Sequence, residues 1–213
     1  MDQKLLFLIN HEWASPALDR LMAVMSSGAF WAVPLVLIAV AVAVRAGFKG
    51  RAFLVVTLLA IGLSDAVFGN TIKHAAGRLR PHQSEVGVRT LDLASPAWRG
   101  LFQPLKEKIS LGTGRDQPGN SFPSNHAANT AAAALIATLL WRRRGWLAFI
   151  PALIVSYSRI YTGAHWPSDV LAGICVGLAA GLLALLFAEW SWRRWGARLA
   201  PRIATQNPSI LSA

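Results

Sequence analysis

The sequence VLAGICVGLAAGLLALLFA, residues Val170–Ala188, decides the fold class, because it is apolar throughout and holds no charged residue. Its length falls within the roughly 17–25 residues that a helix needs to cross a bilayer. Other apolar stretches lie at Phe30–Val44, Phe53–Leu63, Ala127–Trp141 and Trp146–Tyr157. The pattern predicts an all-α protein, a polytopic membrane helix bundle with about five transmembrane helices, at residues 29–45, 52–72, 125–141, 146–162 and 168–189.

The composition of the chain agrees with a membrane protein and excludes several other classes. Of the 213 residues, 54% are hydrophobic and 15% are charged, whereas globular proteins have about 25% charged residues. This balance, with a single cysteine, excludes disordered, collagen-like, coiled-coil and disulfide-scaffold proteins and a cysteine metal cluster. The net charge of +11 is divided between apolar stretches. We therefore expect the lipid bilayer as a partner, no nucleic acid and no obligatory protein partner.

The distribution of Lys and Arg predicts which loops share one side of the membrane. With five spans, the loop at 45–51, the loop at 142–145 and the C-terminal tail share one side and hold ten Lys and Arg residues. The loop at 82–122 holds five Lys and Arg against four Asp and Glu. Cytoplasmic loops carry the excess of positive charge, so we expect 82–122 on the outer face. The tail at 191–213 is then a basic cytoplasmic tail, and the location a bacterial inner (plasma) membrane.

The N-terminal segment 1–27 is expected on the outer side, ahead of a transmembrane domain at 28–190. Its apolar residues are spaced as in short amphipathic helices: Leu5, Leu6, Leu8, Ile9, Leu18, Leu21, Met22 and Met25. We interpret them as interfacial helices that lie along the membrane surface. A sixth, imperfect span is the alternative, but the polar residues Asn10, His11, Glu12 and Asp19 argue against it.

Three polar sequences stand where the predicted spans meet the outer face. They are KHAAGRLRP at Lys73–Pro81, FPSNH at Phe122–His126 and SRIYTGAHWPSD at Ser158–Asp169. Each alone is explained equally well by interfacial anchoring, by a helix start or by a turn. The predicted topology brings all three to one side of the membrane, and this coincidence favours a common site.

The basic residues of these sequences suit a multiply charged anion. Lys73, Arg80 and Arg159 are cations, and the planar fork of arginine matches phosphate oxygens. Pro123 and Ser124 open a helix whose free N–H groups also favour an anion. Nothing in the sequence resembles a carboxylate-rich magnesium site, so we expect no metal and no cofactor.

Two histidines and a carboxylate add the means for chemistry. His126 and His165 can serve in proton transfer or nucleophilic attack near neutral pH. Asp169 lies one helical turn beyond His165, where a carboxylate bonded to one ring nitrogen fixes the tautomer and leaves the other nitrogen free. Together with three cations, these residues form a set suited to phosphoryl transfer without a metal.

A compound motif runs through the three sequences: Lys73-x6-Arg80-Pro81, Pro123-Ser124-Asn125-His126 and Ser158-Arg159-x5-His165-x3-Asp169. Over about residues 52–189, it resembles the signature of the type 2 phosphatidic acid phosphatase superfamily. The resemblance implies a phosphatase domain at 28–190, in which His165 is the nucleophile, Asp169 orients it and His126 is the general acid. It also implies that the phosphoryl group is bound by Lys73, Arg80, Ser124, Asn125 and Arg159.

Four residues have more than one interpretation or depart from the pattern. Asn125 stands where the family usually has glycine, and we interpret it as tolerated because asparagine accepts left-handed dihedrals. Asp65 is expected to pair with a cation of the site or with a serine of a neighbouring helix. Arg78 is expected to contact a lipid phosphate or to extend to the interface. Trp166 is expected in an outer aromatic belt.

The resemblance implies a metal-independent lipid phosphatase that forms a phosphohistidine and releases inorganic phosphate at the outer, periplasmic face. Undecaprenyl diphosphate is the first expected substrate, and lipid A 1-phosphatase or phosphatidylglycerophosphate phosphatase is the alternative. A non-catalytic anion transporter is a remote alternative, which the His165–Asp169 pair disfavours because transport needs no oriented nucleophile. The predicted spans exclude a soluble haloperoxidase.

Overall fold

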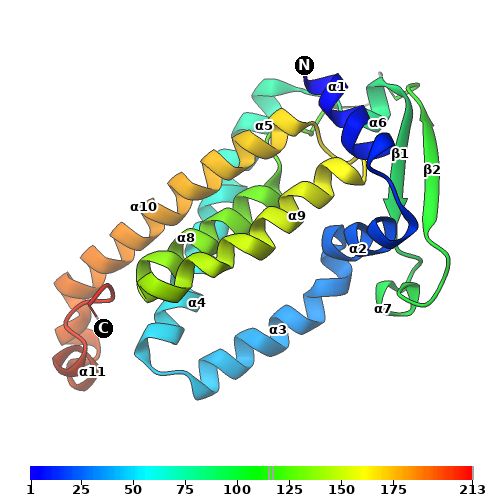
Figure 1. The fold of residues 1–213 in the computed structure, drawn as a ribbon. Helices are drawn as coiled ribbons and strands as arrows, with labels where there is room; N and C mark the ends of the chain where they lie inside the picture. The colour runs from blue at the N-terminus through cyan, green and yellow to red at the C-terminus, as the bar shows by residue number, and fades with distance from the viewer. Residues whose placement is uncertain (115, 117, 213) are drawn as a thin grey trace.

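The computed structural model describes residues 1–114, 116 and 118–212, except for the side chains of residues 67–69. Arg115 and Gln117 of the predicted outer loop, and Ala213 of the predicted tail, lie outside the described residues. Helix α8 contacts three other long helices, and α3 diverges from them after its contact with α4 (Figure 1). The bounds are α3 (Gly28–Arg45), α4 (Phe48–Gly62), α8 (Asn125–Gly145), α9 (Phe149–Tyr161) and α10 (Pro167–Leu199).

Three helices in the described part of the chain are long and apolar enough to cross a membrane: Gly28–Arg45, Phe48–Ser84 and Pro167–Leu199. They confirm the first, second and fifth predicted spans. The second is built from α4, a π-helical turn at Leu63–Gly69 and α5 (Asn70–Ala76). Helices α8 and α9 lie where the third and fourth spans are predicted. Because α8 carries polar residues and α9 has only 13 residues, their passage through the membrane stays a prediction.

Close packing of α8 against α10 brings the two helix starts together. A Cβ atom on Gly177 would lie 2.0 Å from the backbone oxygen of Ala128, and one on Gly173 would lie 2.4 Å from that of Ser124. Small residues let the backbones approach in this way where apolar burial gives little driving force. At the site end, the N–H of Ser124 donates to the backbone oxygen of Asp169 at 3.0 Å.

The predicted outer loop at 82–122 contains a β-hairpin, which the sequence did not predict. Strand β1 (Val86–Asp92) pairs antiparallel with β2 (Lys106–Leu111), and the short helices α6 (Pro81–Ser84) and α7 (Ala97–Gly100) flank β1. Only Val88 and Leu91 of the paired strands are fully buried hydrophobics. The alternation of apolar and polar residues is therefore too short to indicate a strand. The all-α expectation is correct for the bundle and wrong for this loop.

The N-terminal segment forms α1 (Asp2–Phe7), a π-helical turn at Leu8–Glu12 and α2 (Pro16–Ser26). The expected helices are present: Leu6, Ile9 and Met22 pack against protein, whereas Leu5 and Leu21 are exposed. The shared core includes Leu6, Ile9, Met22, Val88, Leu91, Ile160, Tyr161 and Trp166. Asn10 is fully buried and donates to the backbone oxygens of Arg89 at 2.9 Å and Tyr161 at 2.6 Å. At 11 residues, α2 is too short for a sixth span.

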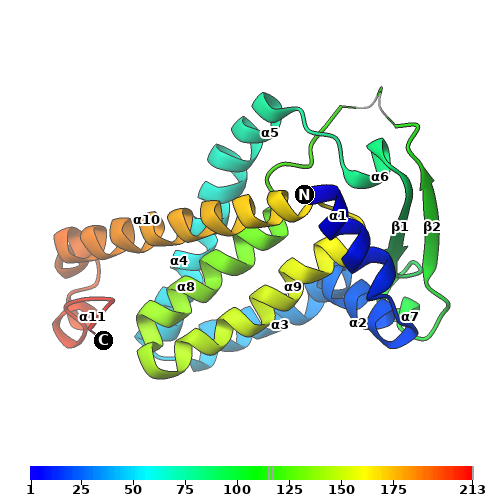
Figure 2. The same ribbon diagram turned by 45° about the horizontal axis from the view of Figure 1, so that its top comes forward.

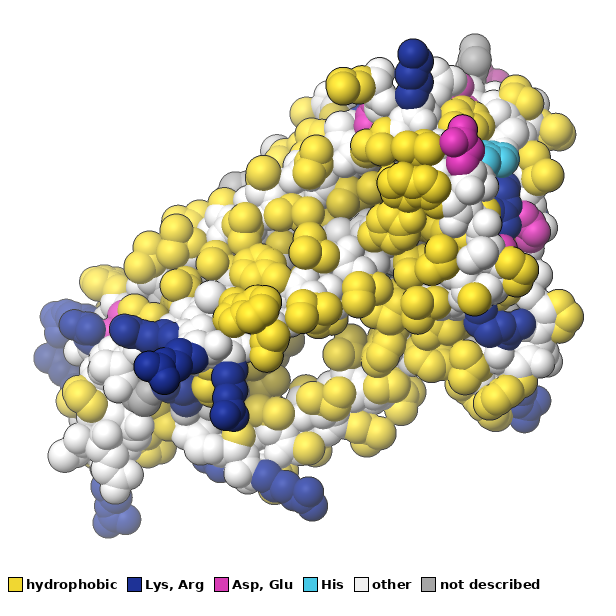
Figure 3. Space-filling model, in the orientation of Figure 1, with side chains coloured by type: hydrophobic (Ala, Val, Ile, Leu, Met, Phe, Trp, Pro, Cys, Tyr) yellow, Lys and Arg dark blue, Asp and Glu magenta, His cyan; other side chains and the backbone are white. Residues whose placement is uncertain are grey.

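The predicted tail at 191–213 is not a separate segment. Helix α10 continues to Leu199, and α11 (Pro201–Gln206) turns the chain back onto it (Figure 2). Nε1 of Trp192 donates to the backbone oxygen of Asn207 at 2.8 Å, and the N–H of Ile210 donates to Oε2 of Glu189 at 2.7 Å. We call this region, with the α3–α4 and α8–α9 turns, the basic end; α1, α6 and the hairpin lie at the opposite, site end (Figures 1 and 3).

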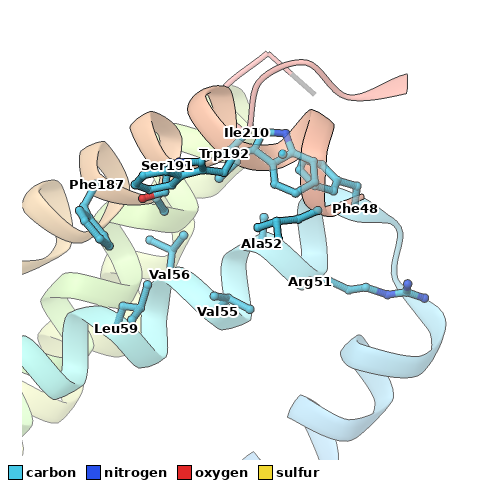
Figure 4. Close-up of a pocket in the computed structure, with 14 residues that line it drawn as sticks. Phe48, Arg51, Ala52, Val55, Val56, Leu59, Phe187, Ser191, Trp192 and Ile210 are labelled. Carbon is cyan, nitrogen blue, oxygen red and sulfur yellow. The ribbon is translucent and has the colours of Figure 1, made fainter. Parts of the chain in front are cut away.

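An apolar groove of about 360 Å³ lies at the basic end, between α4 and α10 (Figure 4). Val55, Val56 and Phe187 are among its lining residues, and Arg51 lies at its margin. None of the residues of the compound motif lines this groove. The groove therefore belongs to the lipid-facing part of the bundle rather than to the candidate site.

Candidate active site

His165 lies in the turn that joins α9 to α10 and is almost fully buried, with 3% of its surface exposed. The turn contains Gly163, whose φ of +67° favours glycine. Nδ1 of His165 lies 2.8 Å from the backbone oxygen of Ser121. A carbonyl oxygen can only accept, so we assign the ring proton to Nδ1, which leaves Nε2 free. This is the arrangement that a histidine nucleophile requires.

Asp169 is fully buried in the first turn of α10. Its Oδ2 accepts hydrogen bonds from Oγ of Ser121 at 2.5 Å and from the N–H of Trp166 at 3.0 Å, and its Oδ1 accepts one from Nη1 of Arg78 at 2.7 Å. Oδ2 lies 3.6 Å from Nδ1 of His165, beyond hydrogen-bond distance. The expected direct bond is therefore wrong in this structure. Ser121 links the two residues, since its Oγ donates to Asp169 and its backbone oxygen faces Nδ1 of His165.

The environment of His165 favours the neutral imidazole. Burial lowers the pKa of His165, because a charged ring loses its hydration. The nearby Asp169 carboxylate opposes this effect, while the positive charges of Arg159 and Arg80 reinforce it. The net shift of the pKa is downward, so His165 is kept in the form that can attack.

The start of α8 supplies the second histidine and an anion-binding helix end. Ser124 is the N-cap and is fully buried, and its Oγ has no hydrogen-bond partner among the described residues. Asn125 begins the helix without a left-handed backbone, since Arg142 is the only described non-glycine residue with positive φ. Asn125 therefore takes the place of the family glycine without needing the left-handed dihedrals given as the reason for its tolerance. His126 follows, and a Cβ atom on Gly28 of α3 would lie 3.6 Å from its Nε2.

The three predicted cations come from three separate elements but act on the same histidine. Lys73 lies in α5, Arg80 follows it before α6, and Arg159 lies in α9. The charges of Arg159, Arg80 and Lys73 all act on His126. Arg159 donates through Nη1 to the backbone oxygen and the hydroxyl of Ser26. Its Nε is buried without a hydrogen-bond partner among the described residues, as expected of a donor that binds a ligand oxygen.

Three expectations about residues near the motif are corrected. Trp166 is buried and donates through Nε1 to the backbone oxygen of Leu79 at 2.9 Å, so it is not a belt residue. Arg78 binds Asp169 rather than extending to the interface. Asp65 accepts from Nδ2 of Asn129 at 3.3 Å rather than from a serine, while its charge acts on Lys73, in line with the other expectation for it.

The sequence reasoning missed three residues that contact the site, Asp2, Ser26 and Ser121, and gave Arg78 a different contact. Each acts through contacts with residues far away in the chain, which local spacing does not reveal. Ser121 directly precedes the FPSNH sequence, and this position is the one signal that pointed toward it.

A polar cavity of about 130 Å³ adjoins the cations on the hairpin side. Arg80 and Arg159 line it together with His82, Thr90 and Asp92. The hairpin thus shares a cavity with two of the residues that the sequence predicts to bind the phosphoryl group. Within residues 1–114, 116 and 118–212, no group of three or more His, Cys, Asp or Glu is placed to hold a metal ion.

A family model described as the PAP2 superfamily matches residues 50–193. The chain belongs to this superfamily. The match covers all three polar sequences and both histidines, and so includes every residue of the compound motif. The name PAP2 stands for the type 2 phosphatidic acid phosphatases that the motif resembles.

Curated relatives within the PAP2 superfamily carry the names of two kinds of lipid phosphatase. A putative undecaprenyl-diphosphatase of Escherichia coli, YbjG, is 35% identical over 103 residues, which are 47% of this chain and 50% of that protein. A lipid A 4′-phosphatase of Bacteroides thetaiotaomicron is 28% identical over 159 residues, which are 73% of this chain and 59% of that protein. The chain thus spans about half to three fifths of the length of these relatives.

Solved structures agree with the PAP2 fold. The crystal structure of Aquifex aeolicus LpxE matches with a TM-score of 0.61 and 24% identity, over 87% of this chain and 94% of that one. A transmembrane PAP2 type phosphatidylglycerolphosphate phosphatase from Bacillus subtilis matches with a TM-score of 0.53 and 22% identity, over 87% and 85%. At these identities the likeness concerns the fold alone.

Proposed function

We propose that this PAP2 protein is an integral membrane phosphatase that hydrolyses a lipid phosphate or diphosphate through a phosphohistidine on His165. One observation carries the proposal. Nδ1 of the buried His165 faces the backbone oxygen of Ser121 at 2.8 Å, so Nε2 is the free nitrogen, beside residues suited to binding phosphate. The geometry favours an enzyme over a non-catalytic anion transporter, because transport needs no oriented nucleophile.

The first step forms the phosphoenzyme. Nε2 of His165 attacks the terminal phosphorus, a P–N bond forms, and the bond from that phosphorus to the leaving oxygen breaks. The leaving oxygen belongs to the lipid alcohol in a monophosphate and bridges the two phosphates in a diphosphate. His126 gives a proton to the leaving oxygen as general acid. Asp169, fully buried and 3.6 Å from Nδ1 of His165, stabilises the positive charge that develops on the imidazole ring.

The second step returns the enzyme. Water attacks the phosphohistidine, His126 accepts its proton, and the P–N bond breaks to release inorganic phosphate. In both steps Lys73, Arg80 and Arg159 neutralise the equatorial oxygens, as metal ions do in other phosphoryl transfers. Oγ of Ser124 and Nε of Arg159, which lack partners among the described residues, and the N–H groups of the first turn of α8 add hydrogen bonds to the same oxygens.

We place the site at the outer, periplasmic face of a bacterial inner membrane. Lys and Arg side chains cluster at the basic end, whereas at the opposite, site end they stand beside Asp and Glu side chains (Figure 3), and an excess of positive residues favours the cytoplasmic side. The broad hydrophobic surface between the two ends in Figure 3 suits the bilayer core. This orientation supports hydrolysis at the outer leaflet.

Undecaprenyl diphosphate is the substrate that we put first. It is favoured by the names of the relatives from Escherichia coli and from Sulfolobus acidocaldarius, the latter an undecaprenyl-diphosphatase 30% identical over 131 residues. A lipid A 1-phosphatase is the second candidate, favoured by a relative of that name from Rhizobium johnstonii that is 32% identical over 141 residues. Phosphatidylglycerophosphate is the third candidate.

A phosphate-release panel tests the proposal. Purified protein in detergent is given undecaprenyl diphosphate, lipid A, phosphatidylglycerophosphate and phosphatidate, with and without excess EDTA. We expect fastest release from undecaprenyl diphosphate, equal rates in EDTA, and competitive inhibition by vanadate. Faster release from lipid A would make the second candidate correct. No release from any lipid would overturn the enzymatic proposal, and inactivation by EDTA that magnesium reverses would overturn the metal-free mechanism.

A further inference from the structure

Among the residues that the structure describes, Arg78 is the one arginine that contacts the buried carboxylate beside His165. Its Nη1 lies 2.7 Å from Oδ1 of Asp169, whereas the neutral donors Ser121 and Trp166 bind the other oxygen, Oδ2. Asp169 is fully buried, and a buried carboxylate needs a paired cation and satisfied hydrogen bonds to remain charged and fixed. Arg78 therefore determines how Oδ1 is held, and with it the direction in which Oδ2 points.

The guanidinium of Arg78 is itself fixed on several sides. Nη2 donates to Oδ2 of Asp2 at 2.6 Å, and Nη1 also donates to Oγ of Ser168 at 2.6 Å. The guanidinium carbon lies 5.1 Å from the ring centroid of Trp166, within the range of a cation–π contact. The planar fork of arginine can serve two carboxylates at once, which the point charge of lysine cannot do in the same way.

Asp2 connects this contact to the start of α10. Its Oδ1 accepts from the N–H of Ser168 at 3.0 Å, and its Oδ2 accepts from Oγ of Ser168 at 2.5 Å. Burial would raise the pKa of Asp2, but hydrogen bonds from Ser168 and Arg78 more than offset this and lower it. Asp2 thus stays ionised, holds Arg78 and caps the helix that carries Asp169.

We propose that Arg78 is a positioning residue that holds Asp169 in place for His165, and that Asp2 acts through Arg78. Arg78 has no role in the proposed phosphoryl contacts, so it acts on the nucleophile through the carboxylate alone. The inference rests on the proposed roles of His165 and Asp169. It assigns a positioning role to an arginine at one of the six unspecified (x) positions between Lys73 and Arg80.

The test measures kcat and KM on whichever lipid phosphate or diphosphate the wild-type protein hydrolyses fastest, together with inhibition by vanadate. We expect Arg78→Ala to lower kcat by about 10- to 100-fold, within the roughly 10⁴-fold that an orienting carboxylate contributes to a histidine in serine proteases. KM and the vanadate inhibition constant should change by less than about threefold, because no phosphate contact is lost. Arg78→Lys should restore part of kcat, and Asp2→Asn should lower it by about three- to tenfold, less than Arg78→Ala.

The decisive comparison is made in the Asp169→Asn background. Because Arg78 acts through Asp169, adding Arg78→Ala to Asp169→Asn should lower kcat by less than about threefold further. The inference is overturned if the double variant loses kcat by the product of the two single-variant fold losses. It is also overturned if Arg78→Ala alone keeps the wild-type kcat. If Asp169→Asn itself keeps the wild-type rate, the proposed role of Asp169 fails instead, and the two failures are thereby distinguished.

Arg89 provides a matched control. It bridges two carboxylates at the same end, with Nη2 3.0 Å from Oδ2 of Asp19 and Nε 2.7 Å from Oε1 of Glu107, but it does not contact Asp169. Arg89→Ala should lower the thermal unfolding midpoint about as much as Arg78→Ala and change kcat by less than about threefold. An equal loss of kcat in Arg89→Ala would show that any lost ion pair here slows the enzyme, and would overturn a specific role for Arg78. If Arg78→Ala does not fold, kcat and the unfolding midpoint of Arg78→Lys and Asp2→Asn are compared with those of Arg89→Ala instead.

Discussion

The two ends of the molecule are both rich in arginine, but they use it differently. At the site end, Arg78 lies between two carboxylates, and Arg89 does the same. At the basic end, the arginines at 142–144 are exposed and form no ion pair in the part of the chain that the structure describes. Buried carboxylates need paired cations, whereas exposed arginines need only water. Arg193 at the basic end also pairs with the buried Glu189. Pairing therefore follows buried carboxylates at both ends, and the unpaired arginines at 142–144 are the ones left to orient the protein in a membrane.

The largest effect is expected at the nucleophile. Replacing His165 by Ala should reduce phosphate release by roughly 10⁴-fold or more, since losing a catalytic nucleophile costs about 10⁶ in kcat in subtilisin. His74, which is exposed in α5 at the same end, is the matched control, and His74→Ala should keep the wild-type rate. Phosphate release by His165→Ala at the wild-type rate would contradict the assignment.

The next effect separates substrate classes through His126. A general acid contributes about 10²–10⁴-fold when the leaving oxygen is strongly basic. A monoester such as phosphatidate expels an alkoxide, whereas a lipid diphosphate expels a phosphate whose second pKa is about 6. His126→Ala should therefore slow monoester hydrolysis far more than diphosphate hydrolysis.

The measurement for His126 is the pre-steady-state burst, which reports phosphoenzyme formation alone. Steady-state rates are less informative, because His126 also serves as the base for water in the second step. Equal losses of the burst rate on a monoester and on a diphosphate would mean that His126 binds phosphate instead of donating a proton.

A smaller effect concerns pH. His165 attacks when neutral, and burial with the charges of Arg159 and Arg80 lowers its pKa below the ordinary value near 6.5. The neutral fraction therefore falls only as the pH drops through this lowered pKa. At saturating substrate, the burst rate at pH 6.5 should exceed half of its plateau value. If the burst rate instead falls to half of its plateau at a pH above 7, the site does not favour the neutral form of His165.

The smallest effect on catalysis is expected at the basic end. Changing Arg142, Arg143 and Arg144 together to Gln should leave kcat within about twofold, because these exposed side chains are not bound to the site. The same change should weaken the orientation of the protein, since the excess of positive charge directs a loop to the cytoplasm. Protease accessibility of the hairpin in sealed vesicles measures this. A large loss of kcat in correctly oriented protein would show that the arginines at the basic end also affect catalysis, contrary to the proposed difference between the two ends.

The sequence predicted the parts of the site that depend on local spacing. The compound motif placed Lys73, Arg80, His126 and Arg159 near the ends of helices that the structure contains, and the charges of the three cations act on His126. This prediction succeeded because a helix depends on the residues along one stretch of sequence. It also succeeded because proton transfer by histidine and phosphate binding by arginine are properties of the side chains themselves. The neutral donors that complete the site have no such local pattern.

The sequence by itself thus determined the apolar helices, the basic end and the identity of the candidate catalytic residues. The tertiary structure alone decided that Ser121 contacts both His165 and Asp169, that Arg78 holds Asp169, and that one face of the N-terminal helices packs on the protein core. The hydrogen bonds of Asp2 to Ser168 join residues 166 positions apart. Such contacts depend on how α8, α10 and the N-terminal segment pack together, and that packing depends on close approach of whole helices rather than on any one stretch of sequence.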